Sequence, residues 1–376
     1  MPWKEATPMS ERKAFVGEAL KAETSLSALC REFAISRKTG YKWLRRYQEE
    51  GLNGLEDQPR RPQHSPTQTP PEVEQVIVEA RQAHPAWGSR KLKRWLENRG
   101  YRSIPAPSTV TDILARHGLL AAEESRKHAP WQRFVMEQPN DLWQMDFKGD
   151  FPMASGQRCH PLTVLDDHSR FLVGLKACSN ETTDIVQGHV TALFREFGLP
   201  ARMLMDNGSP WGGSAQCPYT RLTVWLLRLG IPVSHGRPYH PQTQGKDERL
   251  HRTLKSELLK AAHFDMLDDC QHGFDHWRAV YNHERPHQAL DLDPPAAHYQ
   301  LSSRSFPDTL PPLTFPPGAM IRKVTLTGEV SFRNKRLRVG VAFQMFPVGL
   351  LYDDFNDSLL HVFFNNIRVA TIDLAV

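Results

Sequence analysis

The stretch QPNDLWQMDFKGDF (138–151) alternates apolar and polar residues, which is the pattern of a β-strand with one buried face. Its aromatic and methionine side chains fall on one side of that strand. Asp146 falls on the opposite side, together with Gln144 and Lys148. The pattern therefore predicts a carboxylate that the strand holds firmly but directs away from the core.

The segments that follow alternate between strand and helix patterns. PLTVLDDHSRFLVGLKAC (161–178) indicates two strands joined by a turn at 167–169, and ETTDIVQGHVTALFREFG (181–198) indicates an amphipathic helix. ARMLMDNGSPW (201–211) indicates a strand that stops at the turn signal Asp206-Asn207-Gly208. Asp206 is thus expected at the carboxyl end of a strand, where open α/β sheets place their sites.

HPQTQGKDERLHRTLKSELLK (240–260) indicates a proline-glycine loop that leads into a basic helix with two acids in its first turn. At about 100° of rotation per residue, Glu248 shares a face with Arg252 and Lys255, opposite a stripe of leucines. Asp247 falls on the leucine side instead. We expect Asp247 to be a helix-end charge that favours the amino end through the helix dipole.

Asp146, Asp206 and Glu248 together are three acids presented by two strands and one helix. Such a set suits hard cations, because Mg²⁺ prefers oxygen ligands and binds readily beside phosphates. Two such ions about 3.5–4 Å apart can activate an attacking oxygen and stabilise a leaving one. Arg252 and Lys255, on the face of Glu248, could then hold a DNA backbone beside the metals.

Other polar residues of this region have less specific interpretations. A lone carboxylate is more often a surface acid than a ligand, and spacing does not exclude Asp166 and Asp167 as ligands, although Asp is a common turn residue. His240 is expected to order the proline loop rather than bind metal. His168 and His251 receive no functional assignment.

Proline-rich or basic polar stretches at 58–72, 124–134 and 305–318 divide the chain. We expect a first domain at 1–57, a linker at 58–71, a second domain at 72–123, an α/β domain at 138–300 and a last domain at 317–376.

The first domain has a helix-turn-helix pattern, with a third helix that begins after the N-cap residue Ser36 and ends at Gly51. That helix is expected to expose a basic face that includes Arg45 and Arg46. Its residues nearest DNA bases would be Arg37, Lys38, Thr39 and Lys42. A small helical bundle with a solvated basic face is the alternative.

The other two flanking domains carry weaker signals. Residues 72–123 are helical, with a basic cluster in the middle helix, and resemble a second helix-turn-helix-like DNA-binding domain. Residues 317–376 alternate as short strands, for which a small β-barrel is the natural closure. Arg333, Lys335 and Arg336 are candidate DNA contacts there, although a solvated strand face would carry similar charges.

Composition narrows the class of protein. A net charge of +5 permits nucleic-acid binding without establishing it. Five scattered cysteines without a CxxC pair fit a reducing cytosol and argue against a structural zinc site. The charged amino-terminal sequence does not fit a secretory leader, and no apolar run is long enough to cross a bilayer. We therefore expect a cytoplasmic protein without a membrane partner.

Three motifs, LWQMDFKG (142–149), MDNGSPW (205–211) and HPQTQGKDERLHRTLKSEL (240–258), together resemble the DDE-class transposases of bacterial insertion sequences, whose catalytic core is like that of retroviral integrases. The resemblance implies a ribonuclease H-like core with a mixed sheet flanked by helices. It implies that Asp146, Asp206 and Glu248 bind two Mg²⁺ or Mn²⁺ ions. Arg252 and Lys255 match basic positions that face DNA in the family.

The resemblance also implies binding to terminal inverted repeats of a mobile element, 3′-end cleavage and strand transfer into double-stranded target DNA. A bacterial, nucleoid-associated protein that acts as at least a dimer on DNA would follow. The separation from Asp206 to Glu248 is longer than is commonest in the family, and Asp247 replaces a usually apolar residue. A catalytically inactive DNA-binding regulator and a purely hydrolytic nuclease are the alternatives.

Overall fold

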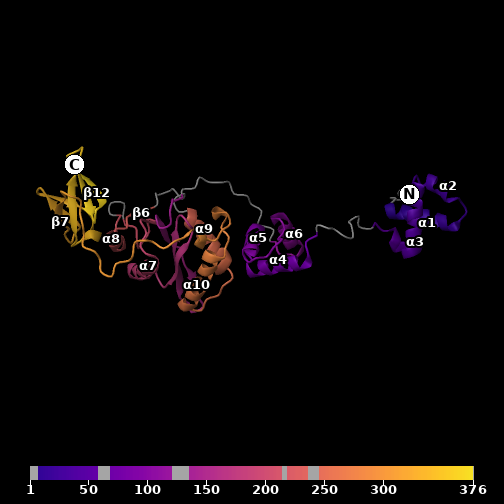
Figure 1. The fold of residues 1–376 in the computed structure, drawn as a ribbon, viewed down its shortest axis with the longest axis horizontal. Coiled ribbons are helices and arrows are strands. Elements are labelled where there is room, and N and C mark those ends of the chain that lie inside the picture. Colours follow the sequence, from indigo (N-terminus) through magenta and orange to yellow (C-terminus); the bar gives the residue numbers. More distant parts are fainter. Residues whose placement is uncertain (1–6, 58–67, 121–134, 214–217, 236–244, 376) are drawn as a thin grey trace, which may run out of the picture. The chain divides into compact units, whose positions relative to one another are not determined.

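A computed structural model describes residues 7–57, 68–120, 135–213, 218–235 and 245–375. The chain divides into two compact units, Met1–Gln68 and Thr69–Val376 (Figure 1). Each unit has its own buried core. No helix in these ranges is long and apolar enough to cross a membrane.

The first unit is a small helical domain with α1 (Pro8–Lys21), α2 (Leu26–Glu32), α3 (Arg37–Glu50) and a short 3₁₀ helix (Gly51–Leu55). Ser36 caps α3, because its hydroxyl accepts a hydrogen bond from the Thr39 backbone N–H at 3.1 Å. Gly51 follows α3 with a φ of 62°. Both ends of this helix were predicted from sequence.

The helix-turn-helix depends on a close approach at Gly40 in α3. A Cβ atom there would lie 2.5 Å from the Cys30 sulfur and 2.9 Å from the Phe15 ring, so the site requires glycine. The predicted exposure of Arg46 is wrong. This guanidinium is buried over Trp43 and donates a hydrogen bond to the Glu56 carbonyl at 3.0 Å, which ties α3 to the segment after it.

The second unit begins with three helices, α4 (Pro71–Ala83), α5 (Ser89–Asn98) and α6 (Pro107–Arg116). Their apolar faces form one core around Ile77, Trp87, Leu92 and Val110. Val280 of a later helix packs against the same core. These three helices therefore pack directly on the domain that follows.

A mixed sheet forms the centre of the second unit. Its strands are β1 (Trp143–Phe147), β2 (Phe151–Pro152), β3 (Arg158–Asp166), β4 (Leu172–Cys178), β5 (Met203–Met205) and β6 (Val233–His235). The strand order is β2-β3-β1-β5-β6, and β4 pairs with β3. β3 is antiparallel to its partners, whereas β1, β5 and β6 run parallel.

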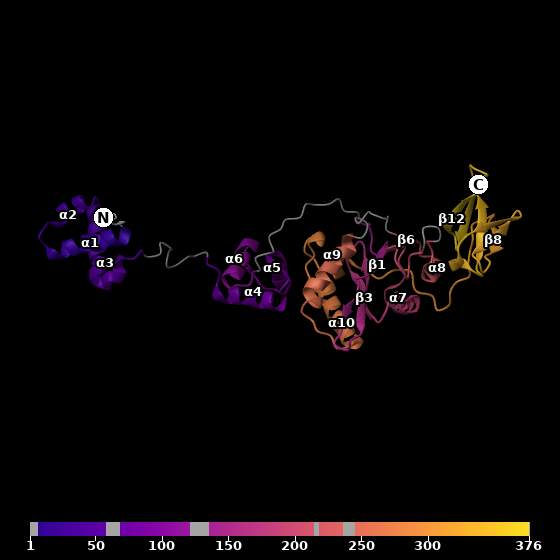
Figure 2. The same cartoon turned by 180° about the vertical axis from the view of Figure 1, so that it is seen from behind.

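Helices cover both faces of this sheet. α7 (Thr183–Phe197) and α8 (Arg221–Arg228) lie on one side, and α9 (Gly245–Leu254) and α10 (Leu267–His283) lie on the other (Figures 1 and 2). A π-helical turn (Lys255–Leu259) continues α9, and 3₁₀ helices follow at Gln288–Leu290 and Pro295–His298. Trp143 and Met145 are fully buried on the α7 side. This confirms the predicted ribonuclease H-like mixed sheet.

The C-terminal region is made of short strands, as predicted, but it is not a closed barrel. β7 (Met320–Lys323), β10 (Pro347–Tyr352), β11 (Leu359–Phe364) and β12 (Ile367–Asp373) form one sheet in the order β12-β11-β10-β7. β8 (Glu329–Phe332) and β9 (Lys335–Arg338) pair with each other, and a 3₁₀ helix lies at Val341–Phe343.

The two C-terminal sheets bury their apolar side chains in one shared core, to which α8 also contributes Val224 and Leu227. The two sheets thus bury their apolar surfaces against each other and against α8, although neither sheet closes into a barrel. The prediction of a small β-barrel is therefore wrong: within the described residues, β7 and β12 stay unpaired edges of an open sheet.

Candidate functional site

Asp146 and Asp206 are brought together by the pairing of their strands. β1 and β5 run parallel with Trp143 opposite Met203 and Gln144 opposite Leu204. Continuing this register places Asp146 and Asp206 side by side at the carboxyl ends of the two strands. The sequence predicted this strand-end position for Asp206, whereas for Asp146 it predicted only a strand position that faces away from the core.

The two carboxylates affect each other. Burial, followed by the charge of Asp206, raises the pKa of Asp146 to about 7 from its ordinary value near 3.8. A hydrogen bond from the Phe147 backbone opposes this effect. Two acids that repel each other in a partly buried position form a site that a positive ion would stabilise.

Trp211 holds the second acid in place. The Asp206 Oδ1 atom accepts hydrogen bonds from the Trp211 indole and, at 2.9 Å, from the Gly208 backbone N–H. The Trp211 ring is buried and stacks on Phe147 with ring centroids 5.3 Å apart. Sequence reasoning missed Trp211, because its only signal was its place in the turn after Asp206.

Glu248 lies in the first turn of α9, but its side chain is exposed. Across the described ranges it makes no hydrogen bond or ion pair, and no three His, Cys, Asp or Glu side chains there are close enough to hold a metal ion. The structure thus brings two of the three predicted acids together. The side chain of the third points into solvent. His240 lies outside the described residues.

The face of α9 that meets the sheet carries Asp247 and His251. The His251 ring contacts the Thr163 hydroxyl at 2.9 Å and lies 3.8 Å from the Asp146 carboxylate, and burial lowers its pKa to about 4, so the ring is neutral. Asp247 is on the leucine side, as predicted, but it is buried rather than a helix-end charge. Burial raises its pKa well above the usual range, which favours the neutral acid.

The turn after β3 uses its two acids differently. Asp166 ends β3 and holds the turn, the role favoured from sequence, because its carboxylate accepts hydrogen bonds from the Asn140 and Ser169 backbone N–H groups. Asp167 reaches across to neighbouring elements instead. Its carboxylate accepts a hydrogen bond from Gln144 at 2.6 Å and lies 2.5 Å from the ammonium group of Lys246.

Basic side chains gather where the π-helical turn continues α9. Lys148, Lys255 and Lys260 line a cavity of about 270 Å³, and no acid among the described residues pairs with any of the three. In the π-turn, the Lys260 backbone N–H donates a hydrogen bond of 3.0 Å to the Lys255 carbonyl, five residues earlier in the chain. Arg252 and Lys255 are both exposed, as predicted.

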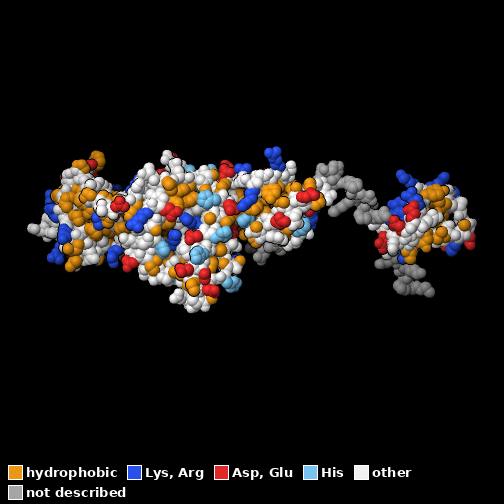
Figure 3. All heavy atoms as spheres, turned by 60° about the horizontal axis from the view of Figure 1, so that its bottom comes forward, with side chains coloured by type: hydrophobic (Ala, Val, Ile, Leu, Met, Phe, Trp, Pro, Cys, Tyr) orange, Lys and Arg blue, Asp and Glu red, His pale blue; other side chains and the backbone are white. Residues whose placement is uncertain are grey.

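The candidate DNA contacts of the flanking domains are exposed, with one exception. Arg37, Lys38 and Lys42 project from α3, whereas the Thr39 hydroxyl contacts Ser36 at 2.9 Å within the helix cap. In the C-terminal hairpin, Arg333, Lys335 and Arg336 are also exposed. Figure 3 shows Lys and Arg side chains on the surface of both regions.

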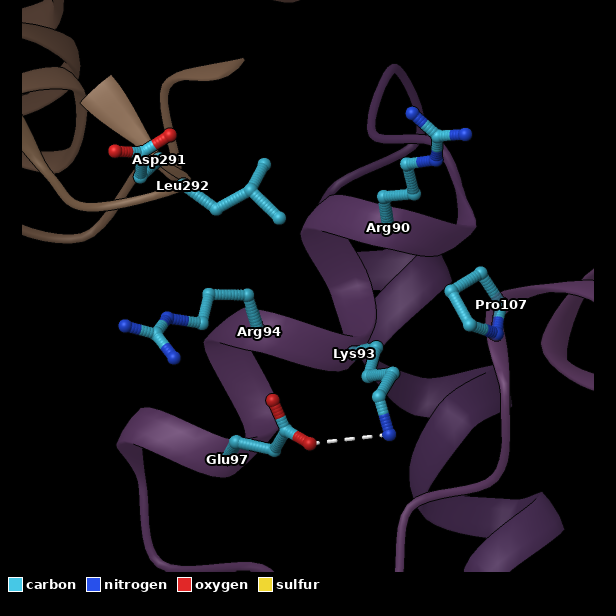
Figure 4. A pocket seen from close by; sticks show the side chains of 7 residues that line it. All are labelled: Arg90, Lys93, Arg94, Glu97, Pro107, Asp291 and Leu292. Carbon is cyan, nitrogen blue, oxygen red and sulfur yellow. Dashed lines mark ion pairs between the residues drawn. The ribbon is translucent and has the colours of Figure 1, made fainter. Parts of the chain in front are cut away.

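The basic cluster of α5 is largely occupied by contacts within the protein. Lys93 pairs with Glu97 at 3.1 Å, and Arg94 pairs with Asp293 at 2.9 Å. Figure 4 shows Lys93, Arg94 and Glu97 around a pocket of about 230 Å³ between α5 and the segment that holds Asp291. Arg90 is exposed at its rim. Arg94 therefore links α5 to the segment after α10, whereas the Lys93–Glu97 pair lies within α5.

The donor set at the strand ends fits a divalent metal ion. Asp146 and Asp206 supply oxygen atoms, which Mg²⁺ and Mn²⁺ prefer. Burial and then the charge of Asp206 raise the pKa of Asp146, and a bound cation would relieve the like-charge repulsion. Glu248 lies in the first turn of a helix that packs on the same face of the sheet, and its exposed side chain is free to turn.

Known protein families match the chain in consecutive segments. Residues 11–63 match a helix-turn-helix domain, and residues 39–114 match a homeodomain-like domain. Residues 136–241 and 229–295 match two integrase core domain families. Residues 319–376 match the C-terminal domain of IS481 family transposases.

Similar proteins come from mobile elements and retroviruses. A 39.2-kDa protein of insertion element IS476 from Xanthomonas euvesicatoria is 28% identical over 255 residues, which is 62% of this chain and 66% of that protein. The Pro-Pol polyprotein of feline foamy virus is 27% identical over 40% of this chain. The chain spans 66% and 13% of the lengths of these two relatives.

Among solved structures, the simian T-cell lymphotropic virus intasome in complex with a PP2A regulatory subunit aligns over 79% of this chain and 99% of its own, with 15% identity and a TM-score of 0.38. The magnesium complex of the HTLV-2 integrase catalytic core aligns over 44% of this chain and 99% of its own, with 15% identity and a TM-score of 0.33.

The family matches follow the order of the domains in the chain: DNA-binding helices first, the integrase core around Asp146 and Asp206 next, and the strands of the C-terminal region last. The chain therefore combines segments that match a helix-turn-helix domain with segments that match an integrase core domain. The chain is thus similar to integrase-core proteins over residues 136–295 and to IS481 family transposases over residues 319–376.

Proposed function

We propose that the protein binds the terminal inverted repeats of a mobile element, cleaves the 3′ ends and transfers them to target DNA. The observation that carries this proposal is the charge-coupled pair of Asp146 and Asp206 at the ends of adjacent parallel strands. Glu248 is the third acid of the proposed site, because its helix packs on the same face of the sheet.

These three carboxylates would hold two Mg²⁺ or Mn²⁺ ions. When bound, such ions supply activation of an attacking oxygen and charge stabilisation of a leaving oxygen in phosphoryl transfer. The chain's own residues prepare the site. Trp211 and Gly208 orient the Asp206 carboxylate, and the neutral His251 ring fills the space beside Asp146 without adding charge.

DNA recognition is proposed to involve several domains. Arg37, Lys38 and Lys42 of α3 would meet the terminal repeat, with Thr39 acting mainly as part of the helix cap. The lysines around the cavity beside α9, together with Arg252, would hold backbone phosphates near the acids. The exposed basic hairpin of the C-terminal region would add further phosphate contacts, through Arg333, Lys335 and Arg336.

Joining two element ends requires two active sites, so we propose at least a dimer on DNA. A catalytically inactive regulator remains the second candidate function. The exposed Glu248 side chain favours it, because the three acids do not meet within the described residues.

The two functions differ in what Glu248 does. For a transposase, Glu248→Gln is expected to abolish Mg²⁺-dependent strand transfer while the affinity for a terminal-repeat duplex stays within about twofold. Glu196→Gln, on the exposed side of α7, is the matched control and should leave both properties intact. Full strand transfer by Glu248→Gln would refute the acidic triad, and no cleavage by the wild-type protein would favour the regulator.

A further inference from the structure

We propose that Asp167, acting through Lys246, is a positioning residue that sets the place of α9, and hence of Glu248, relative to Asp146. This inference rests on the proposed metal site and adds a residue to it. Asp167 is 1% exposed and follows the last residue of β3. It touches neither of the two paired acids and would act through the elements that carry them.

Asp167 is bonded to β1, the strand that carries Asp146. Its Oδ1 atom accepts a hydrogen bond from the Gln144 side chain at 2.6 Å, and its backbone N–H donates to the Leu142 carbonyl at 2.9 Å. Gln144 lies two residues before Asp146, so their side chains point to the same face of the sheet. The Asp167 carboxylate is therefore fixed relative to the strand that presents Asp146.

Asp167 is also bonded to α9, the helix that carries Glu248. The Lys246 ammonium group lies 2.5 Å from Asp167 Oδ1 and 3.3 Å from the Asp167 carbonyl oxygen. The Lys246 side chain is 17% exposed, so water screens this ion pair little. Lys246 lies in the first turn of α9, two residues before Glu248. The buried Asp167 carboxylate thus links β1, which carries Asp146, to α9, which carries Glu248.

A second attachment lies one turn further along α9, where the His251 ring contacts the Thr163 hydroxyl. Two attachments on one helix set both its distance from the sheet and its rotation about its own axis. The Glu248 side chain makes no hydrogen bond or ion pair within the described residues. Its reach toward Asp146 is therefore set by the backbone that Lys246 and His251 hold.

A DNA contact is the competing role for Lys246. The ion pair argues against it, because a lysine that is mostly buried against Asp167 presents little of its charge to a phosphate. The roles differ in measurable ways. A phosphate contact would change DNA affinity and its salt dependence, whereas a positioning role would change metal affinity with DNA affinity intact.

The test uses the full chain and Mn²⁺ alone as the probe, with binding measured by electron paramagnetic resonance. Lys246→Met and Asp167→Asn should each weaken Mn²⁺ binding by about tenfold, the scale seen when supports of metal ligands are removed. The variant that carries both substitutions should bind Mn²⁺ no more weakly than the single variant with the lower Mn²⁺ affinity. Lys246→Arg should recover most of the affinity, because it keeps the charge.

Glu257→Gln is the matched control. It breaks another buried ion pair on the same helical segment, with Arg285 at 2.9 Å, but at the far end from Glu248. It should lower the unfolding temperature and leave Mn²⁺ affinity unchanged. The proposal is overturned if Glu257→Gln weakens Mn²⁺ binding as much as Lys246→Met, or if Lys246→Met leaves Mn²⁺ affinity intact, whether or not it reduces DNA affinity.

Mn²⁺ binding also separates this inference from the proposed function. If the wild-type protein binds Mn²⁺ in a way that Lys246→Met weakens, yet cleaves no DNA, the positioning role stands and the transposase activity fails. If Glu248→Gln abolishes strand transfer but Lys246→Met binds Mn²⁺ normally, the proposed activity stands and the positioning role fails.

Discussion

At the scale of single residues, the site depends on carboxylates whose surroundings differ sharply. Asp146 is partly buried beside another acid, Asp247 is buried on the leucine side of α9, and Glu248 is exposed. Adjacent positions on one helix can differ this much because successive residues point about 100° apart. The charge state of each acid therefore follows from its neighbours rather than from its residue type.

The raised pKa of Asp146 predicts a pH-dependent stability when metal is removed. An acid whose pKa is higher in the folded chain binds more protons when folded, so the free energy of unfolding falls as pH rises from about 4 to 7. The loss is on the order of 4 kcal/mol. In a chelator, Asp146→Asn should raise the unfolding temperature at pH 8 but not at pH 4.

Thermal unfolding followed by circular dichroism at the two pH values would measure this effect. Glu196→Gln, on the opposite face of the sheet, should show no such difference. Equal stabilisation by Asp146→Asn at both pH values would mean that burial and the charge of Asp206 do not raise the pKa of this carboxyl group.

At the scale of secondary-structure elements, α3 is held by close packing at Gly40. Gly40→Ala would force a Cβ against Cys30 and Phe15, and overpacking of this kind costs about 1–3 kcal/mol. We expect faster hydrogen exchange of the α3 amides and weaker DNA binding. Gly17→Ala in α1 is the control: its Cβ would meet no atom within 4 Å, so it should be stabilising by up to about 1 kcal/mol.

The π-turn after α9 gives a prediction about phosphate contacts. Lys260→Gln should reduce the slope of log affinity against log salt for a terminal-repeat duplex by about 0.9, which is the contribution of one phosphate. Lys176→Gln on β4 is the control in the same domain and should leave the slope unchanged. An unchanged slope for Lys260→Gln would remove this lysine from the DNA surface.

At the scale of the whole molecule, the chain combines a helix-turn-helix unit with a unit that contains the integrase core. The unit Met1–Gln68 has its own core, so it can be removed without exposing the core of the rest. Deleting residues 1–57 should lower affinity for terminal repeats by at least about tenfold relative to random DNA, because base contacts carry specificity. Mn²⁺ affinity should stay the same.

Competition binding with terminal-repeat and random duplexes would measure this loss. If the truncated protein keeps full preference for terminal repeats, the helix-turn-helix of α3 is not the reader, and α4 to α6 or the C-terminal sheets must carry the specificity.

Much of the core could be predicted because it depends on local pattern. Alternation along 138–151 identified the strand that presents Asp146, and the turn signal after Met205 located Asp206. Ser36 and Gly51 marked the ends of α3. The rotation of about 100° per residue placed Asp247 on the side of the leucines. It did not show that Asp247 is buried, because burial depends on what packs against the helix.

Sequence by itself indicated the strands that present Asp146 and Asp206, the helix that carries Glu248, their order along the chain, and the family that the motifs resemble. Tertiary structure decided which side chains meet. The Asp167–Lys246 link joins residues far apart in sequence, the C-terminal strands form two open sheets rather than a barrel, and Arg46 turns inward. Local periodicity reports the direction of a side chain, whereas its partner is chosen by packing between distant segments.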